Sequence, residues 1–192
     1  MIITYQGENY FKIQSGETSL LVDPTNQRSF KGSSLVLNTV RPSYVEYDGN
    51  SEVFWIDHQG EYEIKGIHVR GWSAGNEDGT EKTIYRVTFD EIVISVLGHI
   101  TNDPPNEFLE YLEGTDVLIA PAGGKPWISP PSIAKFIRQM EPSVVIPSLF
   151  KDIKPFLKEF NKESVPSEEK YVFKKKDLSP NAMEIRKLEE KK

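Results

Sequence analysis

Four short runs of apolar residues place the strongest limits on the fold of this chain. They lie at residues 35–37, 92–97, 116–120 and 144–146, and each is almost free of polar side chains. A strand with one face in water alternates apolar and polar residues, whereas an uninterrupted apolar strand needs cover on both faces. We therefore expect these four segments to form inner strands of the core.

The two halves of the chain predict different arrangements of elements. Residues 1–97 contain short β-prone runs separated by turns, among them a hairpin turn at Lys65-Gly66. After Gly98, strands alternate with segments whose apolar residues recur at helical spacing, at 104–112, 129–140 and 153–160. Antiparallel strands followed by β-α-β alternation predict an α/β (α+β) fold with two packed sheets and helices outside, an αββα layering.

Length and composition limit the domain organisation and the compartment. We expect one domain at residues 1–177 and a charged, solvated tail at residues 178–192. The 192 residues include no cysteine, which excludes disulfides and thiolate chemistry and fits a reducing cytoplasm. The first residues have neither a basic region nor a long apolar stretch, so we expect no signal peptide.

The charge and the apolar runs exclude two classes of partner. No run approaches the roughly 20 apolar residues that a membrane-spanning helix needs, so no membrane span is expected. The formal net charge is -6. Binding to nucleic acid concentrates lysine and arginine against phosphates, so the acidic balance argues against a nucleic-acid partner.

Histidine is scarce in this sequence. The chain has three histidines, His58, His68 and His99, and no two of them are two or four residues apart. Close spacing of that kind is typical of a preformed metal site, so the pattern predicts none. We expect His58 and His68 on the surface. The sequence also lacks a Gly-x-Ser-x-Gly turn for a nucleophilic serine and a glycine-rich phosphate loop.

Six segments of residues 1–150 carry a family resemblance. They are Ile3-Thr4-Tyr5-Gln6-Gly7, Phe11-Lys12-Ile13, Leu21-Val22-Asp23-Pro24, Gly60-Glu61-Tyr62-Glu63-Ile64-Lys65-Gly66, Ile119-Ala120-Pro121-Ala122-Gly123-Gly124 and Glu141-Pro142-Ser143-Val144-Val145-Ile146-Pro147. In this order they resemble the metallo-β-lactamase-fold hydrolases, most closely the branch of the ascorbate-phosphate lactonase-like proteins. The resemblance implies a four-layer αββα sandwich and a hydrolytic site that holds two metals.

The metal ligands implied by that resemblance are replaced in this chain. The family has a Thr-His-x-His-x-Asp-His run after a buried strand; here Thr39 is kept, but the next six residues are Val-Arg-Pro-Ser-Tyr-Val. His99 stands where the family has a bridging aspartate, and Lys125-Pro126-Trp127 replaces a usual Tyr-Thr pair. We therefore expect a metal-free vestigial pocket, partly filled by a tyrosine or tryptophan and formed by Val40, Pro42, Tyr44, Asn76, His99, Trp127 and Leu149.

These replacements lead to two functional hypotheses. The first is a catalytically degenerate protein that acts by binding, as a regulatory or structural partner of an active relative, with no cofactor. The second is a hydrolase of a phosphoester or lactone that uses His99, either with one metal held by nearby carboxylates or with no metal. In that hypothesis His99 pairs with Asp103 for proton transfer, and zinc is the only cofactor considered.

A binding role needs an interaction surface. Trp55, Trp72 and Trp127 are candidate anchors for a second copy of the chain or for another protein, since tryptophans concentrate interface energy. Trp72 is the first choice because it precedes the loop expected at residues 73–79. The alternative is that all three tryptophans belong to the core. Trp127 would then plug the vestigial pocket rather than line a ligand site.

Overall fold

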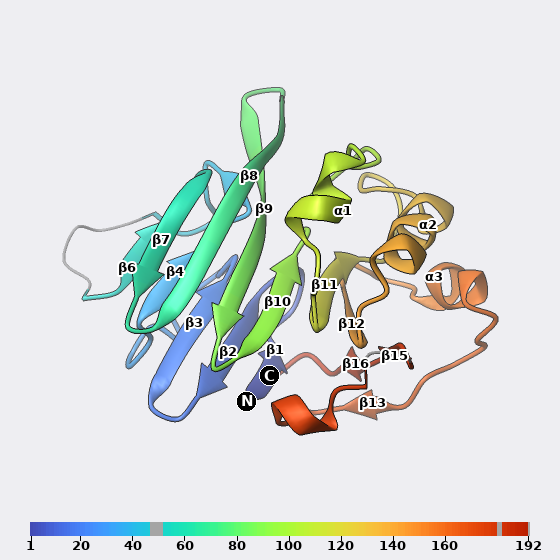
Figure 1. Cartoon of the computed structure of the whole chain (residues 1–192). Helices are drawn as coiled ribbons and strands as arrows, with labels where there is room; N and C mark the ends of the chain where they lie inside the picture. Colours follow the sequence, from blue (N-terminus) through green and yellow to red (C-terminus); the bar gives the residue numbers. More distant parts are fainter. Residues whose placement is uncertain (47–51, 180–181, 192) are drawn as a thin grey trace.

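Two β-sheets packed face to face form the body of the protein (Figure 1). The computed structural model describes residues 1–46, 52–179 and 182–191. The first sheet has the order β14 (Tyr171–Val172), β1 (Ile2–Tyr5), β2 (Phe11–Ser15), β3 (Thr18–Val22), β4 (Leu35–Leu37) and β6 (Phe54–Ile56). The pairings from β14 to β3 are antiparallel, and those of β3, β4 and β6 are parallel.

The second sheet changes from antiparallel to parallel along the chain. Its order is β15 (Glu184–Ile185), β12 (Val144–Ser148), β11 (Val117–Pro121), β10 (Ile92–Val96), β9 (Thr80–Phe89), β8 (Ile67–Glu77) and β7 (Gly60–Ile64). The short strand β5 (Val40–Arg41) also pairs with β9. The expected hairpin turn joins β7 to β8 at Lys65 and Gly66, both with positive φ.

Helices cover the outer face of the second sheet, as Figure 1 shows for α1 (Glu107–Tyr111), α2 (Pro130–Met140) and α3 (Lys154–Glu159). Their buried side chains, such as Phe108, Ile133 and Phe156, pack with Leu118 and Val145 of the sheet. Ser129 caps α2 by accepting a hydrogen bond from the N–H of Ser132, as its Ser-Pro-Pro start predicts. The expected α+β sandwich is confirmed.

The apolar runs behave as the sequence predicts. Strands β4, β11 and β12 are buried at every residue, and β10 is buried at four of its five residues. One face of each contributes to the core between the sheets, while Leu118 and Val145 point into the helical layer and Val36 into a third cluster with Tyr10 and Leu21. In that third cluster Phe30 and Trp55 cover the outer face of the first sheet.

The expectation of a solvated tail is wrong for residues 184–191. Strand β15 pairs in parallel with β12, and β16 (Lys187–Leu188) pairs with β13 (Ser167–Glu168). Ile185 and Leu188 are buried, and the N–H of Lys191 donates to the carbonyl of Tyr5 at 2.9 Å. Two apolar side chains and an open strand edge therefore outweigh the charge of this segment, and Glu190 and Lys191 lie beside β1, the first strand of the chain (Figure 1).

No helix in the described part of the chain is long and apolar enough to cross a membrane.

Candidate functional site

Three turns at one edge of the sandwich bring polar side chains into its interior. Asp23 follows β3, Thr39 follows β4, and His99 follows β10 after a turn at Gly98. The carboxyl ends of the parallel strands β3 and β4 meet at the same edge, which places Asp23 next to Thr39. All three side chains are buried, and His99 is only 1% exposed.

These side chains form a continuous hydrogen-bonded chain that we call the Asp23–Tyr44 relay: Asp23, Thr39, His99 and Tyr44. Thr39 Oγ1 donates to Asp23 Oδ2 at 2.5 Å and lies 2.9 Å from His99 Nδ1. On the other side of the ring, His99 Nε2 lies 3.1 Å from the Tyr44 hydroxyl. The relay therefore runs from a buried carboxylate to a tyrosine at the surface.

The direction of each proton follows from the partners. The single proton of the Thr39 hydroxyl is given to Asp23, so the Thr39 oxygen accepts from His99 and Nδ1 carries a proton. In a neutral imidazole, Nε2 is then an acceptor, and the Tyr44 hydroxyl donates to it. Burial lowers the pKa of His99, against the opposing effect of the Asp23 and Glu8 carboxylates, which favours this neutral form.

The Tyr44 phenol is held in its protonated form as well. Desolvation is the largest effect that raises the pKa of Tyr44, and the negative charges of Asp23 and Glu8 act in the same direction. Tyr44 is nevertheless 56% exposed, so its ring reaches solvent while its oxygen contacts the buried histidine. The phenol is thus a hydrogen-bond donor with an imidazole acceptor behind it.

Asp23 is fixed by three donors. Oδ1 accepts the backbone N–H of Thr39 at 2.6 Å, and Oδ2 accepts both the Thr39 hydroxyl and the Asn9 side-chain amide at 2.5 Å. The same Oδ2 lies 3.5 Å from His99 Nδ1. A buried carboxylate requires such donors to remain charged, so this set holds a negative charge next to the histidine.

Two close contacts fix the histidine ring. The edge of His99 packs on Trp127, with ring centroids 4.9 Å apart and planes at 74°. Gly98 has a positive φ of 61°, and a Cβ at this position would lie 2.3 Å from Thr39 Oγ1. Only glycine allows the turn to bring His99 this close to Thr39.

Acidification should destabilise the protein through His99. The folded state binds the proton less readily than the unfolded chain, whose histidine pKa is about 6.5. Stability is therefore full above about pH 6.5 and falls as the pH drops from there toward the lowered pKa of the folded state. In denaturant unfolding, the wild type should lose stability over this pH range and His99→Gln should not. The control His68→Gln, altered at an exposed histidine, should lose stability as the wild type does.

The other residues expected in the vestigial pocket are only partly brought together. Val40 and Leu149 are buried, and the N–H of Leu149 donates to the carbonyl of Glu8 at 2.9 Å. Pro42 is exposed, and Asn76 is exposed on β8, opposite Glu81 of β9. Of the seven residues, Tyr44, His99 and Trp127 have direct contacts with one another through the imidazole.

The carboxylate partner expected for His99 has to be corrected. Asp103 is exposed, and no interaction of its side chain with His99 is found within the described residues; the carboxylate at His99 belongs to Asp23. Asp103 is near His99 in sequence. Asp23 lies 76 residues before His99 in the sequence and follows a strand of the other sheet. The Asp23-Pro24 break after an apolar strand was the signal that could have identified it. His58 and His68 are exposed, as expected.

The donors at this site do not fit a pair of metal ions. Both ring nitrogens of His99 and both oxygens of Asp23 already have partners in the relay. In the described ranges, no group of three or more His, Cys, Asp or Glu side chains could hold a metal. Metal sites in proteins need three or four such ligands, so the described side chains of this site do not match the ligand set of a metal pair.

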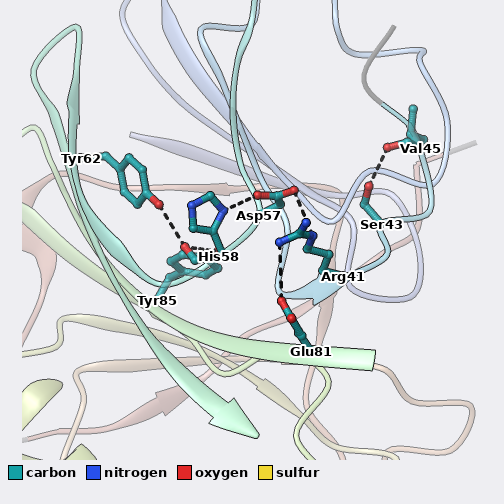
Figure 2. A network of polar contacts seen from close by, with 8 residues as sticks. All are labelled: Arg41, Ser43, Val45, Asp57, His58, Tyr62, Glu81 and Tyr85. Atoms are coloured by element: carbon teal, nitrogen blue, oxygen red, sulfur yellow. Dashed lines mark hydrogen bonds and ion pairs between the residues drawn. The ribbon is translucent and has the colours of Figure 1, made fainter. Parts of the chain in front are cut away.

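A second polar cluster lies beside the relay and surrounds Arg41 of β5. Figure 2 shows Asp57 between Arg41 and His58, with His58 Nδ1 2.5 Å and Arg41 Nε 3.8 Å from its carboxylate oxygens. Arg41 also lies 3.7 Å from Glu81. The guanidinium is therefore held between two carboxylates, and because its side chain is 55% exposed a ligand in solvent can still reach it.

These residues border a cavity of about 280 Å³. We call it the Arg41 cavity; it is lined by Arg41, His58, Gln59, Ser73, Gly75, Asn76, Glu81, Lys82 and Thr83. Lys82 is buried, and its ammonium lies 2.6 Å from Glu77 and 3.1 Å from the Thr101 hydroxyl. The cavity is small and polar and includes Asn76, one of the positions where a family ligand is replaced.

The sequence and the structure were both compared with known proteins. The model of the family described as "Beta-lactamase superfamily domain" matches residues 2–148. None of the curated proteins matches the chain. Solved structures share its fold at low sequence identity.

A metallo-beta-lactamase superfamily protein from Thermotoga maritima has a TM-score of 0.78 and 18% identity, covering 98% of this chain and 99% of that one. The metallo-beta-lactamase fold protein YhfI from Bacillus subtilis has a TM-score of 0.68 and 9% identity, covering 98% and 96%. Igni18, a metallo hydrolase from Ignicoccus hospitalis, has a TM-score of 0.63 and 14% identity, covering 90% and 99%.

These identities show the fold alone, whereas the family match covers more than half of the sequence. With the geometry of the site, it identifies the chain as a divergent member of the metallo-β-lactamase superfamily, in which a hydrogen-bonded relay stands where the family pattern has metal ligands.

Proposed function

We propose that this protein works without the metal pair of its family and acts by binding, as a regulatory or structural partner of an active relative. The observation that carries the proposal is the state of His99 and Asp23, whose ligating atoms are all engaged within the relay. A metal would have to break these hydrogen bonds, and the part of the chain that the structure describes offers no set of three such ligands around it. No cofactor is therefore part of the proposal.

The Arg41 cavity supports the binding role. The side chains of Arg41 and His58 line this cavity and are 55% and 57% exposed, so both can meet a ligand or a partner side chain. Trp72 is a weaker anchor than its sequence position indicates, because it is half-buried and stacked on Tyr111 with ring centroids 5.0 Å apart. The partner is a second copy of the chain or another protein, and light scattering distinguishes these two cases. The absence of cysteine supports a cytoplasmic location.

Excess zinc should leave thermal unfolding unchanged. A ligand that binds only the folded state raises the unfolding midpoint. At a concentration of about 100 times its dissociation constant, it adds about 2.7 kcal/mol to the free energy of unfolding. Without a zinc site, the midpoints in zinc and in chelator should coincide. The His99→Gln variant is the matched control, since any zinc effect on the relay must depend on this ring. A higher midpoint in zinc that is lost in His99→Gln would contradict the proposal.

The relay also favours a second candidate function, hydrolysis without a metal. A surface hydroxyl, a neutral imidazole and a buried carboxylate lie in sequence within hydrogen-bond reach. Such an order is typical of nucleophile, base and orienting group in metal-free hydrolases. Like the first candidate function, this one needs no metal. Unlike the first, it predicts turnover of a substrate.

A further inference from the structure

The side chains of the relay differ sharply in their exposure to solvent. Tyr44 is 56% exposed, whereas His99 and Asp23 are each 1% exposed. Tyr44 is therefore the residue of the relay that a small molecule in solvent meets first. The Tyr44 oxygen is the only relay atom that joins the surface to the buried base among the residues that the structure describes.

The distances fit a nucleophile that is activated by a base. The Tyr44 oxygen lies 3.1 Å from His99 Nε2, within the roughly 2.6–3.2 Å range expected between a nucleophile and its base. His99 is in turn oriented through Nδ1 by Thr39 at 2.9 Å, with the Asp23 carboxylate 3.5 Å away. The order hydroxyl, imidazole, carboxylate matches that of a catalytic triad, with Thr39 inserted between the last two groups.

We propose that Tyr44 is the nucleophile of a metal-free acyl-transfer site that accepts carboxylic esters, lactones included. This inference rests on the second candidate function. Tyr44 attacks the carbonyl carbon, a bond forms between its oxygen and that carbon, and the phenolic proton passes to His99 Nε2. The ester C–O bond then breaks, and the leaving alkoxide takes this proton from His99. The product is an acyl-tyrosine and an alcohol, and the alcohol stays attached to the acyl group when the substrate is a lactone.

Water completes the cycle with the same groups. A water molecule attacks the acyl carbon while His99 Nε2 accepts its proton, and the bond to the Tyr44 oxygen breaks. The proton then returns from His99 to that oxygen, so a carboxylic acid leaves and the relay is restored. The Asp23 carboxylate stabilises the imidazolium that forms in each half of the cycle, at 3.5 Å from Nδ1.

The local charge selects esters over phosphoesters. Asp23 and Glu8 both act on Tyr44 and His99 with negative charge, while Lys82 is the cation that acts on His99. Lys82 is itself paired with Glu77 at 2.6 Å. A phosphate group would bring further negative charge to the carboxylates, whereas an uncharged ester carries none to the site. Trp127 adds an apolar ring beside His99.

The test uses p-nitrophenyl acetate and the full chain in excess chelator. We expect a rapid release of nitrophenol of about one equivalent, slower turnover, and acetylation of Tyr44 located by peptide mass spectrometry. General base catalysis by a positioned histidine contributes about 10²–10⁴-fold, so His99→Gln should slow acetylation by at least about 10²-fold. Tyr44→Phe keeps the ring and removes only the oxygen, and it should abolish the rapid phase.

Tyr111→Phe is the matched control, because Tyr111 is a second surface tyrosine, stacked on Trp72 rather than bonded to a histidine. It should react like the wild type. Equal acetylation in wild type and Tyr44→Phe, or the absence of a Tyr44 adduct, would overturn the inference. If zinc still has no effect on unfolding, that result leaves the metal-free binding role in place. A rate that rises with zinc, together with a higher midpoint, would overturn both proposals.

Discussion

Asp23→Ala should lower the free energy of unfolding by about 2 to 5 kcal/mol. The carboxylate accepts the backbone N–H and the hydroxyl of Thr39 and the side-chain amide of Asn9, and these groups are buried. Alanine cannot accept any of them, and each buried donor left without a partner costs about 1–3 kcal/mol. Denaturant unfolding followed by circular dichroism measures the loss.

Asp103→Ala is the control for this variant. Asp103 is exposed, and exposed substitutions away from special features change stability by roughly 0.5 kcal/mol or less. The comparison decides which aspartate organises the histidine site, the one near His99 in sequence or the one near it in space. Equal and small losses in both variants would contradict the relay.

Gly98→Ala should also destabilise the protein by about 2 to 5 kcal/mol. A left-handed backbone costs a residue with a Cβ about 1–2 kcal/mol, and Gly98 has a φ of 61°. The new methyl would also lie 2.3 Å from Thr39 Oγ1 and 2.4 Å from its Cβ, and forced overpacking of this kind costs about 1–3 kcal/mol. The turn would have to move, and the hydrogen bond between Thr39 and His99 would lengthen.

Gly16→Ala separates the two effects. Gly16 has a similar φ of 56°, and a Cβ there would meet no described atom within 4 Å. This variant has the strain of a left-handed backbone without the steric clash, so its free energy of unfolding should fall by about 1–2 kcal/mol. The difference in unfolding free energy between the two variants measures how tightly Thr39 is packed against the turn. If Gly98→Ala is as stable as Gly16→Ala, Thr39 is free to move away.

The candidate site was only partly predictable from the sequence. The replacement of the family ligands pointed to Tyr44, His99 and Trp127, and these three side chains do lie together. Asp23 and Thr39 were visible as a strand break and a retained family residue, but nothing in their spacing joined them to His99. Their contact depends on how β4 and β10 are placed in two different sheets.

The position of the C-terminal segment, residues 184–191, was not predictable from the sequence either. Its charged composition predicted a solvated tail, yet Ile185 and Leu188 are buried and the backbone pairs with β12 and β13. Composition records the average polarity of a segment, whereas two apolar residues next to an open strand edge decide where it lies. A local pattern cannot show that such an edge is available 40 residues earlier in the chain.

The sequence by itself determined the inner strands β4, β10, β11 and β12 and their burial, because an uninterrupted apolar run is a local property that each segment carries in its own residues. It also determined the loss of the metal ligands, since ligand chemistry depends on residue type. Only the tertiary structure decided that Asp23, Thr39, His99 and Tyr44 form one relay. Hydrogen bonds require donors and acceptors within about 3 Å, and the packing of the two sheets sets those distances between residues far apart in sequence.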